Sequence, residues 1–119
     1  MLVIEGYKPV ISKKNKLKFG RGRAYKCQSV LDFEDYCSRL AYQYMKDNGL
    51  AMIKNPVRLT LDIVFGDRRR RDLQNCFDTI CDSLNNIVYE DDSQITELSG
   101  TKRYEKGIWK FTITIEEIK

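Results

Sequence analysis

The residues best suited to chemistry are carboxylates in the second half of the chain. From Asp72 to Glu97 the sequence has seven acids and neither lysine nor arginine. Asp72 follows an alternating apolar segment, and Glu90-Asp91-Asp92 forms a turn after a helical pattern. Carboxylates that come close together repel one another unless a divalent cation bridges them, and Mg²⁺ prefers such oxygen ligands. If the helix packs on a sheet, we expect Asp92 to lie near Asp72 and to form a magnesium site with it.

Both acidic elements also have an ordinary structural interpretation. Asp72 stands where a helix begins, and aspartate is a common N-cap residue. Three adjacent acids in a turn, such as Glu90 to Asp92, are usually just solvated. The metal hypothesis therefore depends on the two elements coming together in the fold.

Two basic segments accompany the acids. Arg68 to Arg71 are four consecutive arginines, which repel one another unless a polyanion such as a phosphate backbone neutralises them. The segment from Lys8 to Lys26 has eight basic residues and no acid, with Phe19 and Tyr25 between the charges. This mixture is typical of an arm that follows a phosphate backbone and stacks on a base. The charge pattern predicts a polyanion-binding surface with a cation site set into it.

The absence of histidine excludes several kinds of active site. With no histidine among 119 residues, the chain cannot form a Ser-His-Asp triad, a Cys-His dyad or a histidine metal site. Its four cysteines show no C-x-x-C spacing, which argues against a zinc ribbon or a thioredoxin-type site. Any catalysis must therefore use carboxylates, lysines or a metal held by oxygen ligands.

Length and composition predict one domain over residues 1–119, because 42% hydrophobic residues suffice for a small core. No segment approaches the roughly 20 apolar residues of a membrane span, and the N-terminal residues do not resemble a signal peptide. We expect a cytoplasmic protein without a membrane partner.

Hydrophobic periodicity predicts the elements that position these residues. The expected order is a strand over 2–7, a long mobile loop over 8–27, a helix over 29–48, a strand over 57–65, a helix over 73–84, and a terminal β-hairpin of strands 95–104 and 109–115. Ser29 and Asp32 suggest a capping box for the first helix, and Gly49 ends it. The fold class is α+β, with two helices packed on one face of a small mixed sheet.

The second helix has two different sides. Its apolar stripe is predicted to consist of Leu73, Phe77, Ile80 and Leu84. Gln74, Asp78 and Asp82 follow one another at intervals of four residues, so they project together from another side.

Three motifs in this region resemble a known family. Asp67-Arg68-Arg69-Arg70-Arg71-Asp72-Leu73-Gln74-Asn75 is followed by Asp82-Ser83-Leu84 and then by Val88-Tyr89-Glu90-Asp91-Asp92-Ser93-Gln94-Ile95. In order and spacing these motifs are similar to those of the RusA Holliday junction resolvases, small phage and prophage-type endonucleases. That family's pattern is roughly R-D-x-D-N, a helix with a lysine and D-A-L, and then D-D-x-Q-[IV]. The resemblance is dense across residues 66–98, and chain length and element order agree with it.

The resemblance implies a homodimeric, Mg²⁺-dependent endonuclease that cuts branched DNA, above all four-way junctions, in recombination and repair. Mn²⁺ is the expected substitute metal, and no nucleotide cofactor is expected. Asp72 and Asp92 match two essential acids of the family, with Asp91 as a further metal ligand. The family's third acid falls on Gln74, a neutral ligand, and its helical lysine falls on Asp78, a carboxylate that restores the lost charge if it reaches the metal. The expected DNA-binding residues are Arg68, Arg69, Arg70, Arg71, Asn75, Lys14, Lys16, Lys18, Arg21 and Arg23.

Two alternatives remain open at the level of sequence. The first is a branched-DNA-binding protein of the same fold, in which Gln74 and Asp78 have weakened or abolished cleavage. The second is a general single-strand or RNA-binding module, which the basic aromatic arm favours and the acidic cluster does not.

Overall fold

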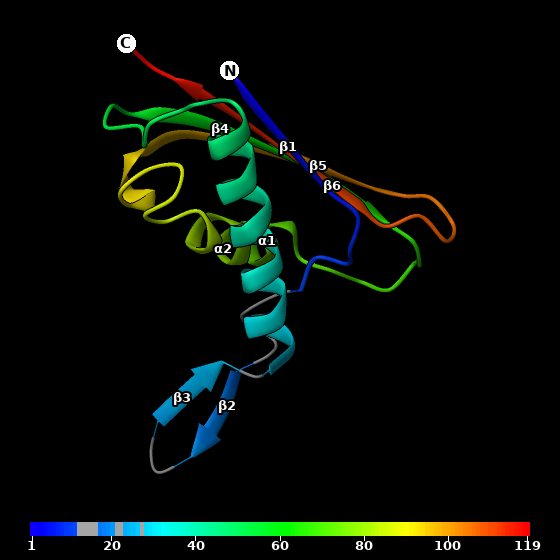
Figure 1. Ribbon diagram of the computed structural model, residues 1–119. Coiled ribbons are helices and arrows are strands. Elements are labelled where there is room, and N and C mark those ends of the chain that lie inside the picture. Colours follow the sequence, from blue (N-terminus) through cyan, green and yellow to red (C-terminus); the bar gives the residue numbers. More distant parts are fainter. Residues whose placement is uncertain (12–16, 21–22, 27) are drawn as a thin grey trace.

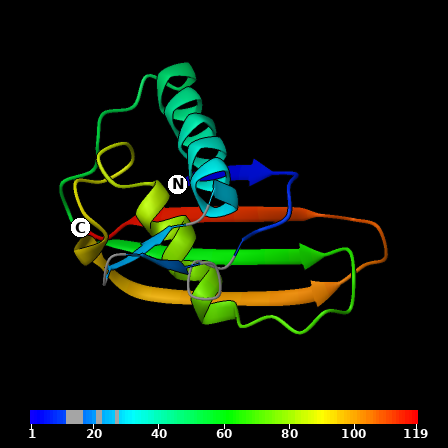
Figure 2. The same cartoon turned by 90° about the horizontal axis from the view of Figure 1, so that it is seen from below.

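A mixed four-stranded sheet carries two helices on one of its faces. The computed structural model describes residues 1–11, 17–20, 23–26 and 28–119. The strand order is β1 (Leu2–Gly6), β6 (Lys110–Glu117), β4 (Val57–Phe65) and β5 (Ile95–Tyr104). Figures 1 and 2 show helices α1 (Gln28–Asp47) and α2 (Leu73–Ser83) on the same side of this sheet. The predicted α+β class and the packing of both helices on one face are confirmed.

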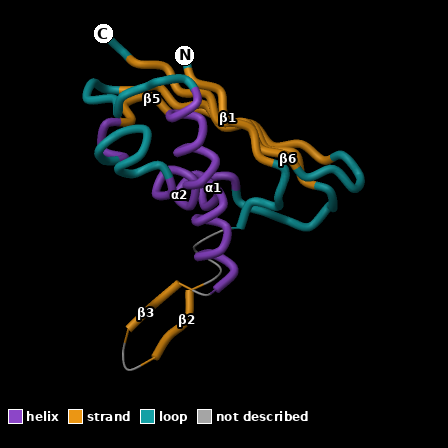
Figure 3. The backbone as a smooth tube through the Cα atoms, in the orientation of Figure 1, coloured by secondary structure: helices purple, strands orange, loops and turns teal. Residues whose placement is uncertain are grey.

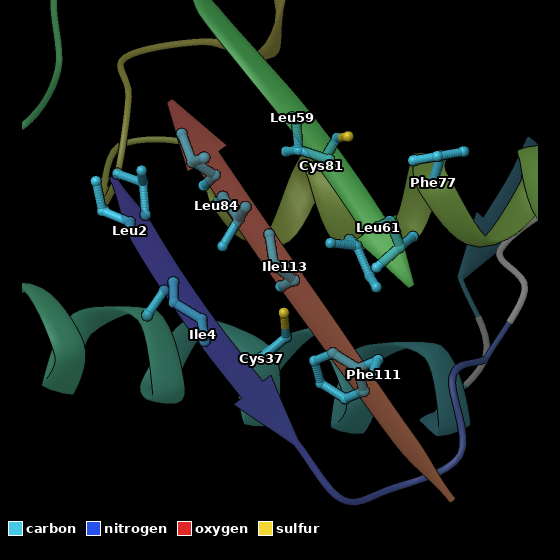
Figure 4. Close-up of a cluster of buried hydrophobic side chains, with 14 of the residues drawn as sticks. Leu2, Ile4, Cys37, Leu59, Leu61, Phe77, Cys81, Leu84, Phe111 and Ile113 are labelled. Carbon is cyan, nitrogen blue, oxygen red and sulfur yellow. The ribbon is translucent and has the colours of Figure 1, made fainter. Parts of the chain in front are cut away.

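Strand β4 lies inside the sheet because its side chains supply much of the core. Val57, Leu59, Leu61 and Ile63 are buried, each at most 1% exposed. β4 pairs in parallel with β5 and antiparallel with β6, and α2 connects the two parallel strands. Figure 4 shows the helices and strands meeting through Leu59, Leu61, Phe111, Ile113, Cys37, Cys81 and Leu84.

The predicted terminal hairpin is wrong. β5 and β6 do not pair with each other, because β4 lies between them. The apolar β4 takes an inner position, whereas β5 has mostly exposed side chains and suits the edge of the sheet. The turn after β5 is tied to the end of β4 instead, since the Glu105 amide donates to the Phe65 carbonyl and the Gly107 amide to the Gly66 carbonyl.

The segment predicted as a mobile loop contains a hairpin. β2 (Leu17–Gly20) and β3 (Arg23–Lys26) pair antiparallel as a separate two-stranded sheet, seen below the helices in Figure 1. A short alternation of apolar and basic residues around Gly20 and Gly22 is enough for such a ribbon. A search for sustained periodicity over the whole segment misses it.

The helix boundaries largely follow the sequence. α1 begins at Gln28, one residue before the predicted cap Ser29, and the Gln28 side chain donates to the Asp32 carboxylate at 2.7 Å. The predicted stop at Gly49 is confirmed, because this residue has φ +61° and the Leu50 amide donates to the Met45 carbonyl. In the described parts of the chain, neither helix is long and apolar enough to cross a membrane.

Candidate active site and nucleic-acid interface

Asp72 is the N-cap of α2. Its backbone is extended, with φ −95° and ψ 117°, and its carboxylate accepts a hydrogen bond from the Gln74 amide at 2.9 Å. This bond satisfies one of the free amides at the start of the helix. Asp72 is exposed to solvent at the N-terminus of α2.

The side of α2 that is not packed on the sheet carries the predicted polar row. Gln74 and Asp78 are exposed, and Asp82 is half-buried. By contrast Asn75 is only 8% exposed, which argues against the DNA contact predicted for it. The close packing of α2 requires Gly100 of β5, because a Cβ atom there would lie 2.5 Å from Cζ of Phe77 and 2.6 Å from the Leu61 carbonyl oxygen.

The acidic turn is fixed by Gln94. Asp91 caps the short 3₁₀ helix η2 (Asp92–Gln94), and its carboxylate accepts from the Ser93 amide at 2.9 Å. Hydrogen bonds from Ser93 lower the pKa of this carboxyl group. The Gln94 side chain accepts from the Glu90 and Asp91 amides, and it donates to the Ile53 carbonyl at 2.9 Å.

Gln94 is therefore a positioning residue that sequence reasoning did not single out. The feature of the sequence that indicated it is the D-D-x-Q motif, in which Gln94 is the glutamine. The Asp91 carboxylate, predicted to be a metal ligand, is engaged in the cap.

The charges of Asp72 and Asp92 affect the pKa values of different cysteines of α2. Burial, and to a smaller extent the charges of Asp92, Asp82 and Asp78, raise the pKa of the Cys81 thiol to about 12. Burial likewise raises the pKa of Cys76 to about 11, and there the neighbouring charges are Arg71, Asp72 and Lys102. We call Asp78, Asp82 and Asp92 the acidic row.

The predicted compact ligand set of Asp72, Asp91 and Asp92 is not formed. Among the described residues, no group of three or more acids or cysteines is close enough to hold a metal ion. The physical reason is topological: β4 and β5 are parallel, so the loop after β4 and the turn before β5 start from opposite ends of the sheet. Figure 2 shows η2 at one end and the loop from 66 to 72 leaving the other, with α2 running between them.

The four arginines before α2 have different surroundings. Arg71 donates to the Asp67 carboxylate at 2.6 Å, and its guanidinium lies 4.6 Å from the Phe65 ring centroid. Its side chain is only 19% exposed, so Arg71 holds the loop together. Arg68 stacks 4.5 Å above the Tyr104 ring, while Arg69 and Arg70 are exposed. Three of the four arginines are thus exposed.

The structure adds two cations that the sequence analysis did not single out. The parallel register places Lys102 opposite Ile63 and Arg103 opposite Val64, so both lie beside the arginine loop. The Lys102 ammonium donates to the Arg71 carbonyl at 2.6 Å. Figure 3 shows the loops that follow β4 and β5 at the same end of the sheet. A sequence analysis that took β4, α2 and β5 as a parallel unit would have predicted that Lys102 and Arg103 lie beside the arginine loop, because the carboxyl ends of parallel strands lie at one edge of a sheet.

The predicted arm is only partly covered by the described residues. Lys14, Lys16 and Arg21 lie outside them, whereas Lys18 belongs to β2 and Arg23 to β3. Their contacts with DNA stay a prediction.

Comparison with known proteins agrees with this architecture. The protein-family model described as Endodeoxyribonuclease RusA matches residues 6–116. The chain belongs to the RusA family. Similar relatives are the crossover junction endodeoxyribonucleases RusA of Escherichia coli K12 and of Shigella sonnei, each 29% identical over 102 residues, which are 85% of this chain and 82% of each relative. The RusA match includes both helices, β4, β5 and the arginine loop between β4 and α2.

Proposed function

We propose that this protein is a Mg²⁺-dependent endodeoxyribonuclease that resolves four-way DNA junctions in recombination and repair, and that it acts as a homodimer. The carrying observation is that a RusA-family chain places a basic loop, Arg68–Arg71, directly before a helix whose free side bears carboxylates. Cations of the loop neutralise DNA phosphates without reading sequence, which suits a structure-selective enzyme.

The oxygen ligands available in this chain suit a magnesium ion that is coordinated mainly by water and by phosphates of the DNA. Mg²⁺ commonly binds proteins through one or two carboxylates, together with water and substrate phosphates. Asp72 is the candidate carboxylate at the start of α2, and the neighbouring Gln74 offers a neutral oxygen there, whereas Asp92 belongs to η2 at the other end of the helix. When bound, the metal would supply a polarised phosphate and a water molecule of lowered pKa.

The remaining steps fall to residues of this chain. The positive end of the α2 dipole and the arginines attract the DNA strand. Asp78 is exposed one helical turn beyond Gln74, and its charge, like those of Asp82 and Asp92, raises the pKa of Cys81. If Asp78 compensates for Gln74, its removal lowers the rate of cleavage, whereas decay of the site predicts no effect.

Two identical active sites suit the substrate. A four-way junction has two-fold symmetry, and paired cuts across its axis release two duplexes. A symmetric dimer delivers such cuts without a second kind of subunit.

The test is a gel assay with a labelled four-way junction and a linear duplex of the same sequence, each with Mg²⁺, Mn²⁺ or EDTA. We expect preferential junction binding in all three conditions and symmetric nicks only with metal. Cleavage that continues in EDTA, or equal cleavage of linear duplex, contradicts the proposal.

The second candidate function is junction binding without cleavage, which the neutral, exposed Gln74 specifically favours. In that case the same assay gives a retarded junction band and no nicks with either metal. General single-strand or RNA binding predicts instead that unpaired strands compete better than the junction.

A further inference from the structure

A basic cavity lies between the loop that precedes α2 and the end of β5. Its volume is about 300 Å³, and six of its nine lining residues are arginine or lysine. Its walls are the loop from Asp67 to Arg71 and the strand end from Lys102 to Tyr104, with Phe65 as the remaining lining residue. We call it the basic pocket. Neither Asp72 nor the acidic row lines this pocket.

The single acid of the basic pocket is already neutralised. The Asp67 carboxylate accepts from Arg71 at 2.6 Å and from the Arg69 amide at 3.0 Å, and these bonds lower the pKa of its carboxyl group. Arg103 lies 3.8 Å from Glu105, an exposed pair that contributes little to stability. The lining of the pocket therefore has an excess of positive charge, and its one carboxylate is engaged by Arg71.

One cation of the pocket is oriented before any ligand arrives. The Arg68 guanidinium lies 4.5 Å from the Tyr104 ring centroid. A stacked guanidinium loses less freedom when it binds an anion, and its planar donors match a phosphate. The loop itself is held by Lys102, which donates to the Arg71 carbonyl at 2.6 Å.

We infer that the basic pocket binds a backbone phosphate of the DNA other than the one that is cut, and that Tyr104 orients Arg68 for this contact. The inference rests on the proposed function in taking DNA as the ligand. Binding in this pocket needs no metal ion, because the side chains that contact the phosphate are themselves cations and the pocket is separate from the acids of α2. It adds Lys102, Arg103 and Tyr104 to the DNA-binding surface.

The test measures binding of a four-way junction by fluorescence anisotropy in EDTA, over a range of salt concentrations. Tyr104→Leu removes the ring without changing the charge, and we expect junction affinity to fall about three- to tenfold. Tyr104→Phe keeps the ring and should bind within about twofold of the wild type. Tyr42→Leu, at a 62% exposed tyrosine on α1, is the matched control and should leave affinity unchanged.

A second pair of variants tests the charges. Arg103→Gln should lower the slope of log affinity against log salt by about one, as loss of one phosphate contact does. Arg39→Gln, at an 80% exposed arginine on α1, should leave the slope unchanged. Thermal melts establish that each variant is folded, and Arg103→Gln keeps the test valid if Tyr104→Leu does not fold.

Several results would overturn the inference. These are wild-type affinity in Tyr104→Leu, equal losses in Tyr104→Leu and Tyr104→Phe, or equal salt slopes in Arg103→Gln and Arg39→Gln. A wild-type protein that binds no DNA also overturns it. A protein that binds junctions in EDTA but never cuts them contradicts only the proposed nuclease activity, and the comparison of the variants then still decides on the pocket.

Discussion

Asp72 combines two roles that substitution can separate. Its carboxylate caps α2 through the Gln74 amide, and its charge is a candidate metal contact. Asparagine caps a helix about as well as aspartate, whereas alanine does not. The two substitutions therefore differ in stability while sharing the loss of charge.

We expect Asp72→Asn to abolish junction cleavage and to leave thermal stability and junction binding intact, with binding slightly tighter because phosphate repulsion is reduced. Asp72→Ala should lose the same activity and also destabilise the fold by about 1 kcal/mol, the usual value of an N-cap. Cleavage assays and thermal melts on both variants test this. Full activity in Asp72→Asn would remove Asp72 from the active site.

Gln74 and Asp78 form the second residue-scale question. Gln74→Asp should strengthen Mg²⁺ binding, because the affinity of a site with oxygen ligands rises with the number of charged ligands. Half-maximal cleavage should then need a lower Mg²⁺ concentration. If Asp78 compensates for Gln74, Asp78→Asn should lower the cleavage rate by about tenfold or more, on the scale of one lost charged contact. The measurement is a magnesium titration of single-turnover cleavage. If both variants cleave like the wild type, this face of α2 does not serve the metal.

At the scale of elements, the position of α2 depends on its contact with the edge strand. Gly100 of β5 lets the ring of Phe77 approach the strand, and this contact sets how close α2 lies to β5. The same strand carries Lys102 into the arginine loop. Displacing α2 would therefore disturb both the acidic side and the basic pocket.

Gly100→Ala should destabilise the protein by about 1–3 kcal/mol, the usual cost of overpacking, because its Cβ would meet both Phe77 and the backbone of Leu61. Denaturant unfolding measures this difference. Ser99→Ala, at the neighbouring exposed position, is the control and should change stability by at most about 0.5 kcal/mol. Equal stability of the two variants would show that the strand yields at little cost.

At the scale of the whole molecule, DNA affinity should be dominated by electrostatics. With about six phosphate contacts, raising salt from roughly 50 to 200 mM should weaken junction binding about 10³-fold. Titrations at several salt concentrations give the slope, and a linear duplex of equal length is the comparison. A shallow slope would mean that base or shape contacts, rather than the basic loop, dominate binding.

Assembly is the other property of the whole molecule. We expect a dimer, with twice the 14.0 kDa mass of one chain, at micromolar concentration, because coordinated cuts need two active sites. Light scattering coupled to size-exclusion chromatography measures the mass with and without junction DNA. A 14.0 kDa species in both conditions contradicts a dimeric resolvase.

Local patterns in the sequence are enough to predict most of the strands and helices and the family. Hydrophobic alternation located β4 at its observed bounds, and helical periodicity located α2 to within a residue, because these patterns reflect burial on one face. The bounds predicted for β5 also agree with the structure, although most of its side chains are exposed. The motif order from Asp67 to Ile95 was enough to indicate the RusA family, since function in such enzymes depends on few residues at fixed spacing.

Which strands lie next to one another depends on the fold of the whole chain. Turn residues between β5 and β6 predicted a hairpin, but β4 separates the two strands because its more apolar side chains belong in the interior of the sheet. The resulting parallel pair β4 and β5 sends Asp72 and Asp92 to α2 from opposite ends of the sheet. The same pairing joins Lys102 and Arg103 to four arginines more than 30 residues away in sequence. Such long-range pairing depends on competition among whole strands for burial, which no local pattern records.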